Sequence, residues 1–400
     1  MVRATLKQGK EAASRWGNAG SMGRALAEAA AAVLPMSWVP TAFPVQASGV
    51  DAEFLNRTLV GVAEGARITR AERVGGTSGT TDRVRMALTW DCGDQPHLPA
   101  HVFVKSTPLT AKNRTMVAAL GMARNEVLFY RHARSALSPH AAPRCLFADA
   151  GFGARHLLVL EDVTERGGTP RALADDIDAA YARSMMVTLG QLHAAFWESP
   201  HLHTDLRFVR PERSRPGFAL LLRQFRSVRS KLLRSAEHEL PAEVRQMAQF
   251  VNDNDWALHA NWEVGPQTLI HGDTLLGNTF GLSDGSVGLL DWQVLYRAPG
   301  MRDVAYFLTH SVPAEVRRAH ADEFLQIYLE TLAESGVAEI PTLARAWDAL
   351  RLFAFDAWDS SAICVLWPGL QAPENVQASF ARANAAIVDF DVMPALRRYV

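Results

Sequence analysis

Three polar residues between positions 269 and 291 have the types and spacing of a metal-binding loop. Asp273 and Asn278 follow the apolar, strand-like run "TLI", and Asp291 ends a second strand-like run, "VGLLD". A turn at Asp284–Gly285 separates the two runs, so a hairpin would return Asp291 to the neighbourhood of Asn278 and Asp273. Oxygen ligands of this kind suit Mg²⁺, which binds one or two carboxylates together with phosphate oxygens and water. A carboxylate beside such a metal could also accept a proton from an attacking hydroxyl.

Alternating polar and apolar residues predict a small antiparallel sheet in the first half of the chain. The alternation has the period of two that a half-buried sheet requires, and turn-rich stretches separate the runs. The strands are expected at residues 67–74, 83–90 and 101–106, and a further pair, separated by a turn at 151–153, is expected within 145–163.

Helical periodicity dominates the rest of the chain. Helices are expected at 51–65 and at about 111–136, and apolar residues recur at helical spacing in most stretches beyond residue 162. The hairpin around Asp284 is the exception. The expected fold class is therefore α+β, with an N-terminal helical extension at 1–45, a strand-rich lobe at 46–162 and a mainly helical lobe at 163–400.

Composition excludes several classes of function. The 400 residues include 41 Lys and Arg against 42 Asp and Glu, so the charge balance gives no reason to expect nucleic acid or an anionic membrane as partner. Cys92, Cys145 and Cys364 are far apart and not in metal-site spacing, which fits a reducing cytoplasm. No apolar run reaches the ~20 residues that span a bilayer. The basic, Ala-rich start resembles a signal peptide only loosely, because Glu28 interrupts its apolar stretch.

The spacing of Asp273, Asn278 and Asp291 resembles that of the catalytic and metal-binding loops of kinases. With His271 and Gly272 before the aspartate, it is similar to the aminoglycoside phosphotransferase and choline kinase-like superfamily. The continuation "DWQVLYRAPGMRDVAYFL" is especially similar to the ecdysteroid kinase-like branch. The resemblance implies a bilobal protein kinase-like fold with a small antiparallel-sheet N-lobe and a larger, mainly helical C-lobe.

The same resemblance implies a role for each residue of the loop. Asp273 would be the catalytic base or would orient the acceptor hydroxyl, and Asn278 and Asp291 would bind Mg²⁺. Asp303 would be the buried aspartate that braces the loop. His271 is a second candidate catalytic residue, and a histidine at this position is expected mainly to orient the loop backbone.

The strand-rich lobe contains the parts of a nucleotide site of this superfamily in the expected order. The stretch "GGTSGTT" between two strands permits close approach of backbone to phosphate and offers hydroxyl donors. Lys105 would reach the α- and β-phosphates and pair with Glu126, although Arg124 or Arg131 could pair with Glu126 instead. The stretch 157–163 would receive the adenine on its backbone. The cofactor-binding candidates are Gly75, Gly76, Thr77, Ser78, Lys105, Glu126, Leu160, Glu161 and Val163.

The expected activity is transfer of the γ-phosphoryl group of ATP, with Mg²⁺, to a hydroxyl of a small molecule. In this superfamily helical insertions choose the acceptor, and here they lie at about 198–265 and 313–400. Their aromatic content and the lack of a clear acidic pocket favour a fairly apolar metabolite or natural product. An aminoglycoside-type antibiotic phosphotransferase is the alternative within the same chemistry, and a non-catalytic kinase-like binding protein is the alternative of another class. A metal-dependent hydrolase would leave the glycine loop and Lys105 unexplained.

Several conspicuous residues have a structural interpretation. Asp162 is expected to be a helix cap or a loop residue, and His193 a packed core histidine. The aromatic residues after position 352 are expected in the core, with the acceptor pocket as the alternative for some of them. These aromatic residues are Phe353, Phe355, Trp358 and Trp367.

Overall fold

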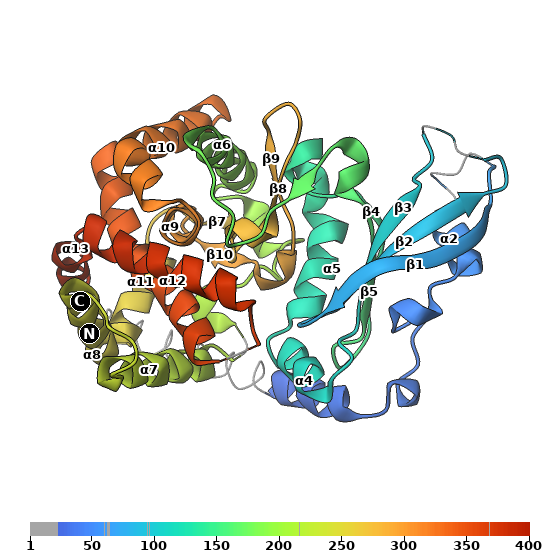
Figure 1. Cartoon of the computed structure of the whole chain (residues 1–400), viewed down its shortest axis with the longest axis horizontal. Helices are drawn as coiled ribbons and strands as arrows, with labels where there is room; N and C mark the ends of the chain where they lie inside the picture. The colour runs from blue at the N-terminus through green and yellow to red at the C-terminus, as the bar shows by residue number, and fades with distance from the viewer. Residues whose placement is uncertain are drawn as a thin grey trace, which may run out of the picture. The chain divides into compact units, whose positions relative to one another are not determined.

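The chain forms two compact units of different architecture (Figure 1). The structure is a computed structural model, and it describes residues 23–59, 61, 65–93, 95, 97–215, 217–367 and 369–400. Within these ranges, unit 1 comprises the residues up to 131 with 144–165 and 214–218, and unit 2 comprises 132–143, 166–213 and 219–400.

Unit 1 is built on a five-stranded antiparallel sheet of order β1-β2-β3-β5-β4. All the predicted strands are present, but β1 runs four residues beyond its predicted end at residue 74, because residues 75–78 pair with β2. Most of the expected nucleotide loop is therefore extended strand. The strands are β1 (Ile68–Ser78), β2 (Asp82–Trp90), β3 (His101–Ser106), β4 (Cys145–Ala150) and β5 (His156–Glu161).

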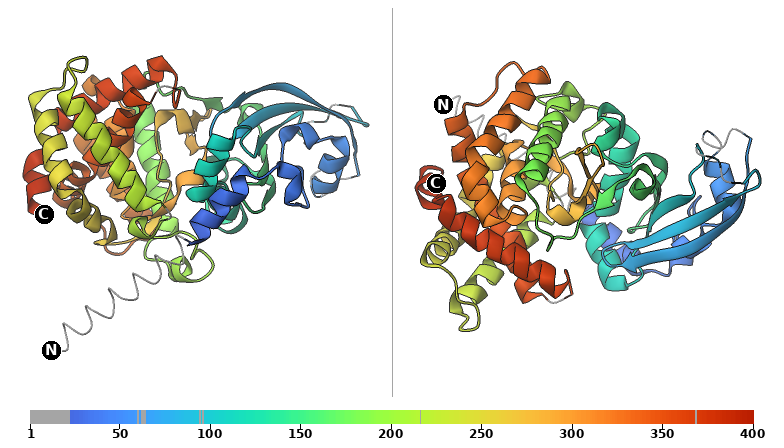
Figure 2. Two further views of the ribbon diagram at one scale, coloured as in Figure 1. Left: turned by 90° about the horizontal axis from the view of Figure 1, so that it is seen from below. Right: turned by 45° about the horizontal axis from the view of Figure 1, so that its top comes forward.

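One face of this sheet packs on the segment that contains α2 (Ala52–Thr58), as Figure 2 shows. Alternate residues of β2, from Val84 to Trp90, are buried against Phe54 and Leu55 of α2. Asp51 caps α2 by accepting a hydrogen bond from the Phe54 amide. The helix is shorter than the predicted 51–65, and residues 60 and 62–64 lie outside the described ranges.

The single helix predicted at about 111–136 is wrong, because the chain forms two helices there. These are α4 (Ala111–Ala119) and α5 (Met122–His132). Gly121 lies between them with φ +68°, a left-handed conformation that ends a helix and that glycine adopts at little cost. Of the predicted N-terminal extension, residues 23–33 are helical, and residues 1–22 lie outside the described ranges.

Unit 2 is mainly helical, with α9 at its centre. Every residue of α9 is buried, and the helix packs against α6, α11 and α12 (Figure 1). The described helices are α6 (Ala179–Ala195), α7 (Phe218–Arg234), α8 (Ala242–His259), α9 (Met301–His310), α10 (Ala314–Glu334), α11 (Leu343–Leu366), α12 (Pro373–Asp389) and α13 (Val392–Arg398).

Two small sheets lie among these helices. One contains β6 (Thr169–Pro170), β8 (Thr279–Gly281) and β9 (Val287–Leu289), and the other pairs β7 (Thr268–Ile270) with β10 (Tyr296–Ala298). The predicted hairpin is confirmed: β8 and β9 are antiparallel, and Gly285 takes φ +84° at the turn between them.

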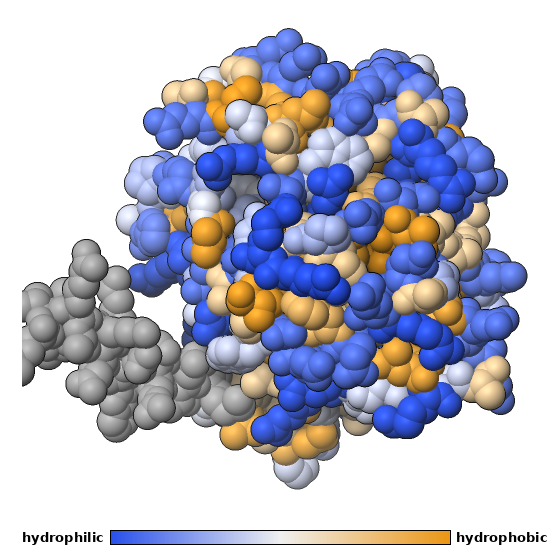
Figure 3. All heavy atoms as spheres, turned by 90° about the vertical axis from the view of Figure 1, so that its left-hand side faces the viewer, coloured by the Kyte–Doolittle hydropathy of each residue, from blue (hydrophilic) through white to orange (hydrophobic). Residues whose placement is uncertain are grey.

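The surface of unit 2 seen in Figure 3 is mainly hydrophilic. Its hydrophobic side chains form small, separate patches on this face. None of the helices in the described ranges has both the length and the apolar character needed to cross a membrane.

Candidate active site

A tight turn after β7 starts the loop that carries the predicted catalytic residues. The turn depends on Gly272, whose φ is +82° and whose position leaves no room for a Cβ, because one would lie 2.8 Å from the Val294 carbonyl oxygen. The carboxylate of Asp303 accepts hydrogen bonds from the amides of His271 (2.6 Å) and Gly272 (3.0 Å). Asp303 thus connects the first turn of α9 to the loop.

Asp303 is fully buried, yet its surroundings favour the ionised form. Burial alone would raise the pKa of this carboxyl group, but a hydrogen bond from His193 and the charge of Arg302 lower the pKa below its usual value. His193 also contacts the hydroxyl of Tyr328 at 3.0 Å and is completely buried. The expectation that His193 is a packed core histidine is confirmed.

Both ring nitrogens of His271 serve the backbone of the loop. Nε2 donates to the Leu290 carbonyl at 2.9 Å, and Nδ1 accepts from the amide of Asp273 at 3.2 Å. The ring is buried against Trp292, with 4.6 Å between the ring centroids. His271 therefore joins the start of the loop to the end of β9.

The carboxylate of Asp273 is held at both oxygens. Asn278 Nδ2 donates to Oδ2 at 2.9 Å and to the Asp273 carbonyl at 2.9 Å, while the Tyr306 hydroxyl donates to Oδ1 at 3.0 Å. Burial and the negative charge of Asp291 raise the pKa of Asp273, and the Tyr306 hydrogen bond and Arg302 oppose this rise. Asp273 as a whole residue is half-buried.

Asp273, Asn278 and Asp291 come together as the sequence predicts. The Leu290 amide donates to the Asn278 carbonyl at 2.8 Å, which places Asp291 beside Asn278, and Asp291 takes the left-handed conformation with φ +64°. Because the Asn278 amide nitrogen faces Asp273, its Oδ1 remains available as a ligand. A pair of carboxylates, one of which raises the pKa of the other, fits a hard divalent cation together with a carboxamide oxygen.

The described ranges contain no group of three or more His, Cys, Asp or Glu side chains that could hold a metal ion. Asn278 and Asp291 would thus supply only two protein ligands. Mg²⁺ is commonly held in this way, by one or two carboxylates with substrate phosphates and water completing the shell. The residues present fit a metal that binds together with a nucleotide.

Arg302 and Tyr306 are site residues that the sequence analysis missed. Arg302 donates to the Gly272 carbonyl at 2.7 Å and to Asp356 at 2.9 Å, and its guanidinium lies over the Tyr306 ring at 4.2 Å. Their positions in the sequence relative to Asp303 are the signal that could have identified both residues. Arg302 precedes Asp303 and Tyr306 follows it by three positions, so a helix places all three near the same loop.

In unit 1, Lys105 and Glu126 form a buried ion pair. Lys105 Nζ on β3 donates to both carboxylate oxygens of Glu126 on α5, at 2.7 and 2.8 Å. Arg131, one of the two alternative partners of Glu126, instead pairs with Asp149 at 3.0 Å. The predicted pairing of Lys105 with Glu126 is confirmed.

The four glycine-loop candidates lie at the exposed end of β1. Gly75, Gly76, Thr77 and Ser78 pair with β2, and the hairpin turn itself is at 79–81. A Cβ on Gly76, which has φ +150°, would lie 2.3 Å from the Arg83 carbonyl oxygen, so the hairpin backbone itself requires glycine here. Asn113 Nδ2 donates to the Gly79 carbonyl at 2.6 Å and connects the turn to α4.

The predicted adenine-binding stretch lies at the end of β5. Leu160 is buried, and the Glu161 amide donates to the Arg144 carbonyl at 2.9 Å. Val163 begins a short 3₁₀ helix (Val163–Arg166) that Asp162 caps by accepting from the Thr164 amide at 3.0 Å. The expectation for Asp162 as a cap is confirmed.

Two acidic residues of α11 form ion pairs with arginines. Asp356 pairs with Arg302, and Asp359 pairs with Arg229; both carboxylates are buried. The half-exposed Ser360 and Cys364 lie one and two turns along α11 from Asp356. The Ser360 side chain lies close enough to Tyr306 to lower the pKa of its hydroxyl group, although burial raises that pKa, and burial, together with the charge of Asp273, raises the pKa of Cys364 to about 11.

The aromatic residues of α11 and its end divide between two environments. Phe353, Phe355 and Trp358 are buried in the core, as expected, whereas Trp367 is partly exposed.

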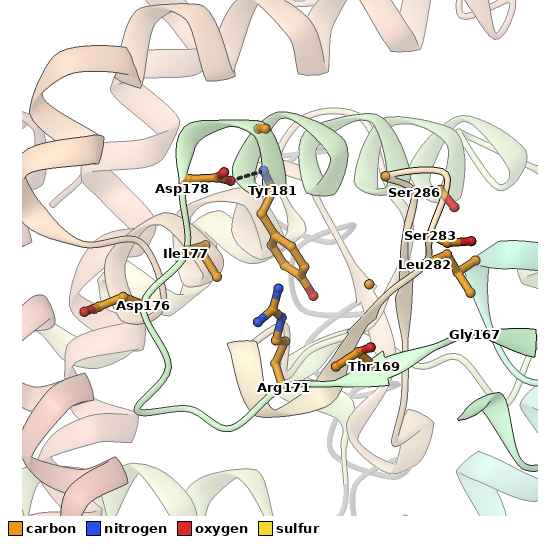
Figure 4. A pocket seen from close by; sticks show the side chains of 13 residues that line it. Gly167, Thr169, Arg171, Asp176, Ile177, Asp178, Tyr181, Leu282, Ser283 and Ser286 are labelled. Carbon is orange, nitrogen blue, oxygen red and sulfur yellow. Dashed lines mark hydrogen bonds between the residues drawn. The ribbon is translucent and has the colours of Figure 1, made fainter. Parts of the chain in front are cut away.

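Unit 2 also contains a cavity of about 660 Å³, whose lining residues Figure 4 shows. It is bordered by β6, the β8–β9 turn and the start of α6. The Arg171 guanidinium lies against the Tyr181 ring at 5.0 Å, and the Tyr181 hydroxyl is 2.7 Å from Thr279 Oγ1. None of the predicted site residues lines this cavity, and Asp176 and Asp178 give it charges opposite to that of Arg171.

Comparisons with known proteins support the same fold. The model of the ecdysteroid kinase-like family matches residues 81–338. Among curated proteins, none matches the chain significantly.

Solved structures with similar folds include kinases and phosphotransferases of small molecules. A Ralstonia eutropha JMP134 protein, provisionally described as an aminoglycoside phosphotransferase, is 12% identical with a TM-score of 0.50, and the match covers 85% of this chain and 98% of that chain. Plasmodium vivax ethanolamine kinase is 12% identical with a TM-score of 0.47, over 82% and 83% of the two chains. A macrolide 2′-phosphotransferase from Brachybacterium faecium is 17% identical with a TM-score of 0.41, over 82% and 98%.

The family match covers more than half of the chain, and the antiparallel sheet of unit 1 and the helical unit 2 agree with the protein kinase-like fold that the sequence predicts. The chain therefore belongs to the ecdysteroid kinase-like family.

Proposed function

We propose that this protein is an ATP-dependent kinase that phosphorylates a hydroxyl group of a small, fairly apolar molecule. The observation that carries the proposal is the arrangement around Asp273. Its two oxygens are held by Asn278 and Tyr306, and Asp291 lies close enough to raise its pKa. An oriented carboxylate beside two potential metal ligands is the arrangement that phosphoryl transfer to a hydroxyl requires.

In this proposal, Asp273 aligns the acceptor hydroxyl and takes its proton. The hydroxyl oxygen forms a bond to the γ-phosphorus, the bond from that phosphorus to the bridging oxygen breaks, and ADP leaves. Asn278 and Asp291 would hold Mg²⁺, which neutralises charge on the phosphate oxygens when it is bound. His271 and Asp303 act as positioning residues, because their polar atoms serve the loop backbone.

Lys105 is the proposed ligand of the nucleotide phosphates. Glu126 fixes the ammonium group through both carboxylate oxygens, so the lysine side chain is ordered before a nucleotide binds. The exposed residues 75–78 and the backbone of 160–163 would contribute to nucleotide binding as well. Ordering the charged groups in advance lowers the cost of reaching the transition state.

The charged residues of α11 favour an acceptor molecule that is not a polycation. An aminoglycoside needs free carboxylates for its ammonium groups, but Asp356 and Asp359 are buried in ion pairs with arginines. The side chains of α11 that interact with Asp273 or Tyr306 and remain half-exposed are Ser360 and Cys364. A neutral hydroxylated molecule suits these surroundings better than the aminoglycoside alternative.

Thermal unfolding with and without MgATP tests the nucleotide site. A ligand that binds only the native state raises the unfolding midpoint, so we expect a rise for the wild type and a smaller rise for Asp291→Ala. Asp284→Ala is the matched control, because Asp284 lies on the same hairpin and its side chain accepts hydrogen bonds from the amide and hydroxyl of Ser286 in the turn. A wild-type midpoint that MgATP leaves unchanged would contradict the proposal.

Turnover with a panel of hydroxylated acceptors tests the chemistry. Asp273→Asn should keep the midpoint rise with MgATP and lose ATP consumption with every acceptor that the wild type phosphorylates. Retained turnover in this variant would remove Asp273 from the catalytic role. Binding without any turnover in the wild type would favour the non-catalytic binding protein instead.

A further inference from the structure

Arg83 on β2 is a cation without a partner in the part of the chain that the structure describes. Its Nε is buried and has no hydrogen-bond partner. Its Nη2 lies at the turn of the glycine-containing hairpin, 3.4 Å from the position that a Cβ of Gly79 would occupy. Burying a polar atom of a charged side chain without a partner raises the free energy of the folded protein. An anion bound beside Arg83 would remove this cost.

The strand register places Arg83 beside Lys105. Residues directly opposite each other in an antiparallel sheet point to the same face, and Arg83 lies opposite Thr77 on β1 and Lys105 on β3. Like charges in such a pair destabilise a sheet. Thr77, Arg83 and Lys105 therefore form a row across three strands, with a hydroxyl group and two adjacent cations on one face of the sheet.

The charged residues near Arg83 on this face of the sheet form ion pairs with other residues. Both oxygens of Glu126 accept hydrogen bonds from Lys105, and Arg85, two residues along the strand on the same face, is paired with Asp162 at 2.5 Å. Asp82 adjoins Arg83 in sequence, but neighbouring residues of a strand point to opposite faces. The charge of Arg83 is thus the one in this row that no protein group compensates within the described ranges.

We propose that Arg83 binds the phosphate groups of the nucleotide, as a second cation beside Lys105. This inference rests on the proposed kinase function. A guanidinium group presents several donors in a plane and binds two phosphate oxygens at once, whereas an ammonium group acts as a point charge. Arg83 would therefore orient the phosphate chain, and Lys105 would neutralise it.

Calorimetric titration with MgATP and with adenosine tests the inference without requiring turnover. Charge-assisted hydrogen bonds contribute roughly 1.5–3 kcal/mol, so Arg83→Gln should weaken MgATP binding about 10- to 100-fold. Adenosine affinity should stay within about twofold of the wild type, since adenosine has no phosphate to contact. Arg73→Gln is the matched control: it removes the same charge from an exposed position of the same hairpin, and we expect its MgATP affinity to remain close to that of the wild type.

The outcomes separate the inference from the proposed function. Equal MgATP affinity of wild type and Arg83→Gln would overturn the role of Arg83 and leave the kinase proposal in place. Parallel losses of MgATP and adenosine affinity would show a structural effect on the hairpin and would also overturn it. A wild type that binds neither ligand would overturn both proposals.

Discussion

The Asp273 carboxylate depends on neighbours that are distant in sequence. Asn278 holds Oδ2 from within the loop, but the partner of Oδ1 is Tyr306, a buried residue of α9. The aspartate can therefore keep one orientation before any substrate binds. Holding a reacting group in place in this way accelerates catalysis without changing the affinity for ATP.

Replacing Tyr306 with Phe should lower kcat and leave the KM for ATP nearly unchanged. The loss of one positioning hydrogen bond is expected to reduce kcat about tenfold. Tyr328→Phe is the control, because Tyr328 is also buried but bonds to His193 rather than to Asp273. Steady-state kinetics of the two variants give the answer, and equal kcat values for Tyr306→Phe and the wild type would contradict a positioning role.

Gly272→Ala should destabilise the protein through the catalytic turn. The left-handed φ and the contact of a Cβ with the Val294 carbonyl together should lower the free energy of unfolding by about 3 kcal/mol. Gly265→Ala isolates the conformational part, because Gly265 has φ +83° but open space around it, and should cost about 1 kcal/mol. Urea unfolding measures both values; equal losses would mean that the loop adjusts to the extra atom.

Local patterns were sufficient to predict which residues of the loop come together. A hairpin with a recognisable turn returns Asp291 to Asn278, and this follows from spacing alone. Arg83 could not be identified in the same way. Its significance depends on which residues of β1 and β3 lie opposite it and on where Glu126 and Asp162 find partners, and these are tertiary facts.

At the scale of elements, α9 and α11 pack against each other and bury many of the side chains around the site. His310 at the end of α9 donates through Nε2 to the Ala357 carbonyl of α11, and its buried Nδ1 has no hydrogen-bond partner among the residues that the structure describes. Burial lowers the pKa of His310 from its usual value to about 4. The imidazole therefore stays neutral in the folded protein well below pH 6.5.

This lowered pKa predicts a loss of stability in acid. The unfolded chain binds a proton at His310 below about pH 6.5 while the folded protein does not, so folding stability falls as the pH drops from 6.5 towards 4. The contribution of His310 to this loss should be about 2 kcal/mol between pH 7 and pH 5. His310→Gln keeps a donor for Ala357 but cannot titrate. Unfolding free energies at the two pH values should therefore differ less in this variant, and an identical difference in both proteins would contradict the prediction.

Element boundaries were predictable where one local signal dominated. The alternation in β2 and β3 and the turn between β8 and β9 were recognised correctly. The break between α4 and α5 was missed, because the left-handed glycine at 121 lies inside a stretch that otherwise reads as one helix. The extension of β1 was missed because its pairing with β2, rather than its glycine-rich composition, makes residues 75–78 a strand.

At the scale of the whole molecule, the candidate residues divide between the two compact units. Unit 1 contains Lys105, Glu126 and Arg83, and unit 2 contains the loop from His271 to Asp291. Within unit 1, Lys105 pairs with Glu126, and within unit 2 Asn278 holds Asp273. The proposed reaction nevertheless requires both groups to act on the same nucleotide.

Hydrogen exchange with and without MgATP tests this requirement. We expect slower exchange of amides at residues 75–84 and also at residues 273–279, because a bound ligand stabilises the segments that contact it. The β8–β9 turn at 282–286 borders the separate cavity and should be unaffected. Protection confined to unit 1 would exclude Asn278 and its neighbours from nucleotide binding.

The bond between Asp303 and the amides of His271 and Gly272 also has a consequence for how the protein can change. The loop is hydrogen-bonded to α9, a helix that is buried along its whole length. We therefore expect the backbone of the loop to be as rigid as the core. Ser360, Cys364 and Trp367, at the end of α11, are half-exposed or exposed and make no hydrogen bond to the backbone of this loop in the described part of the chain. Under the proposed function, we expect substitutions at these positions to change which acceptor is used while the geometry of the loop stays the same.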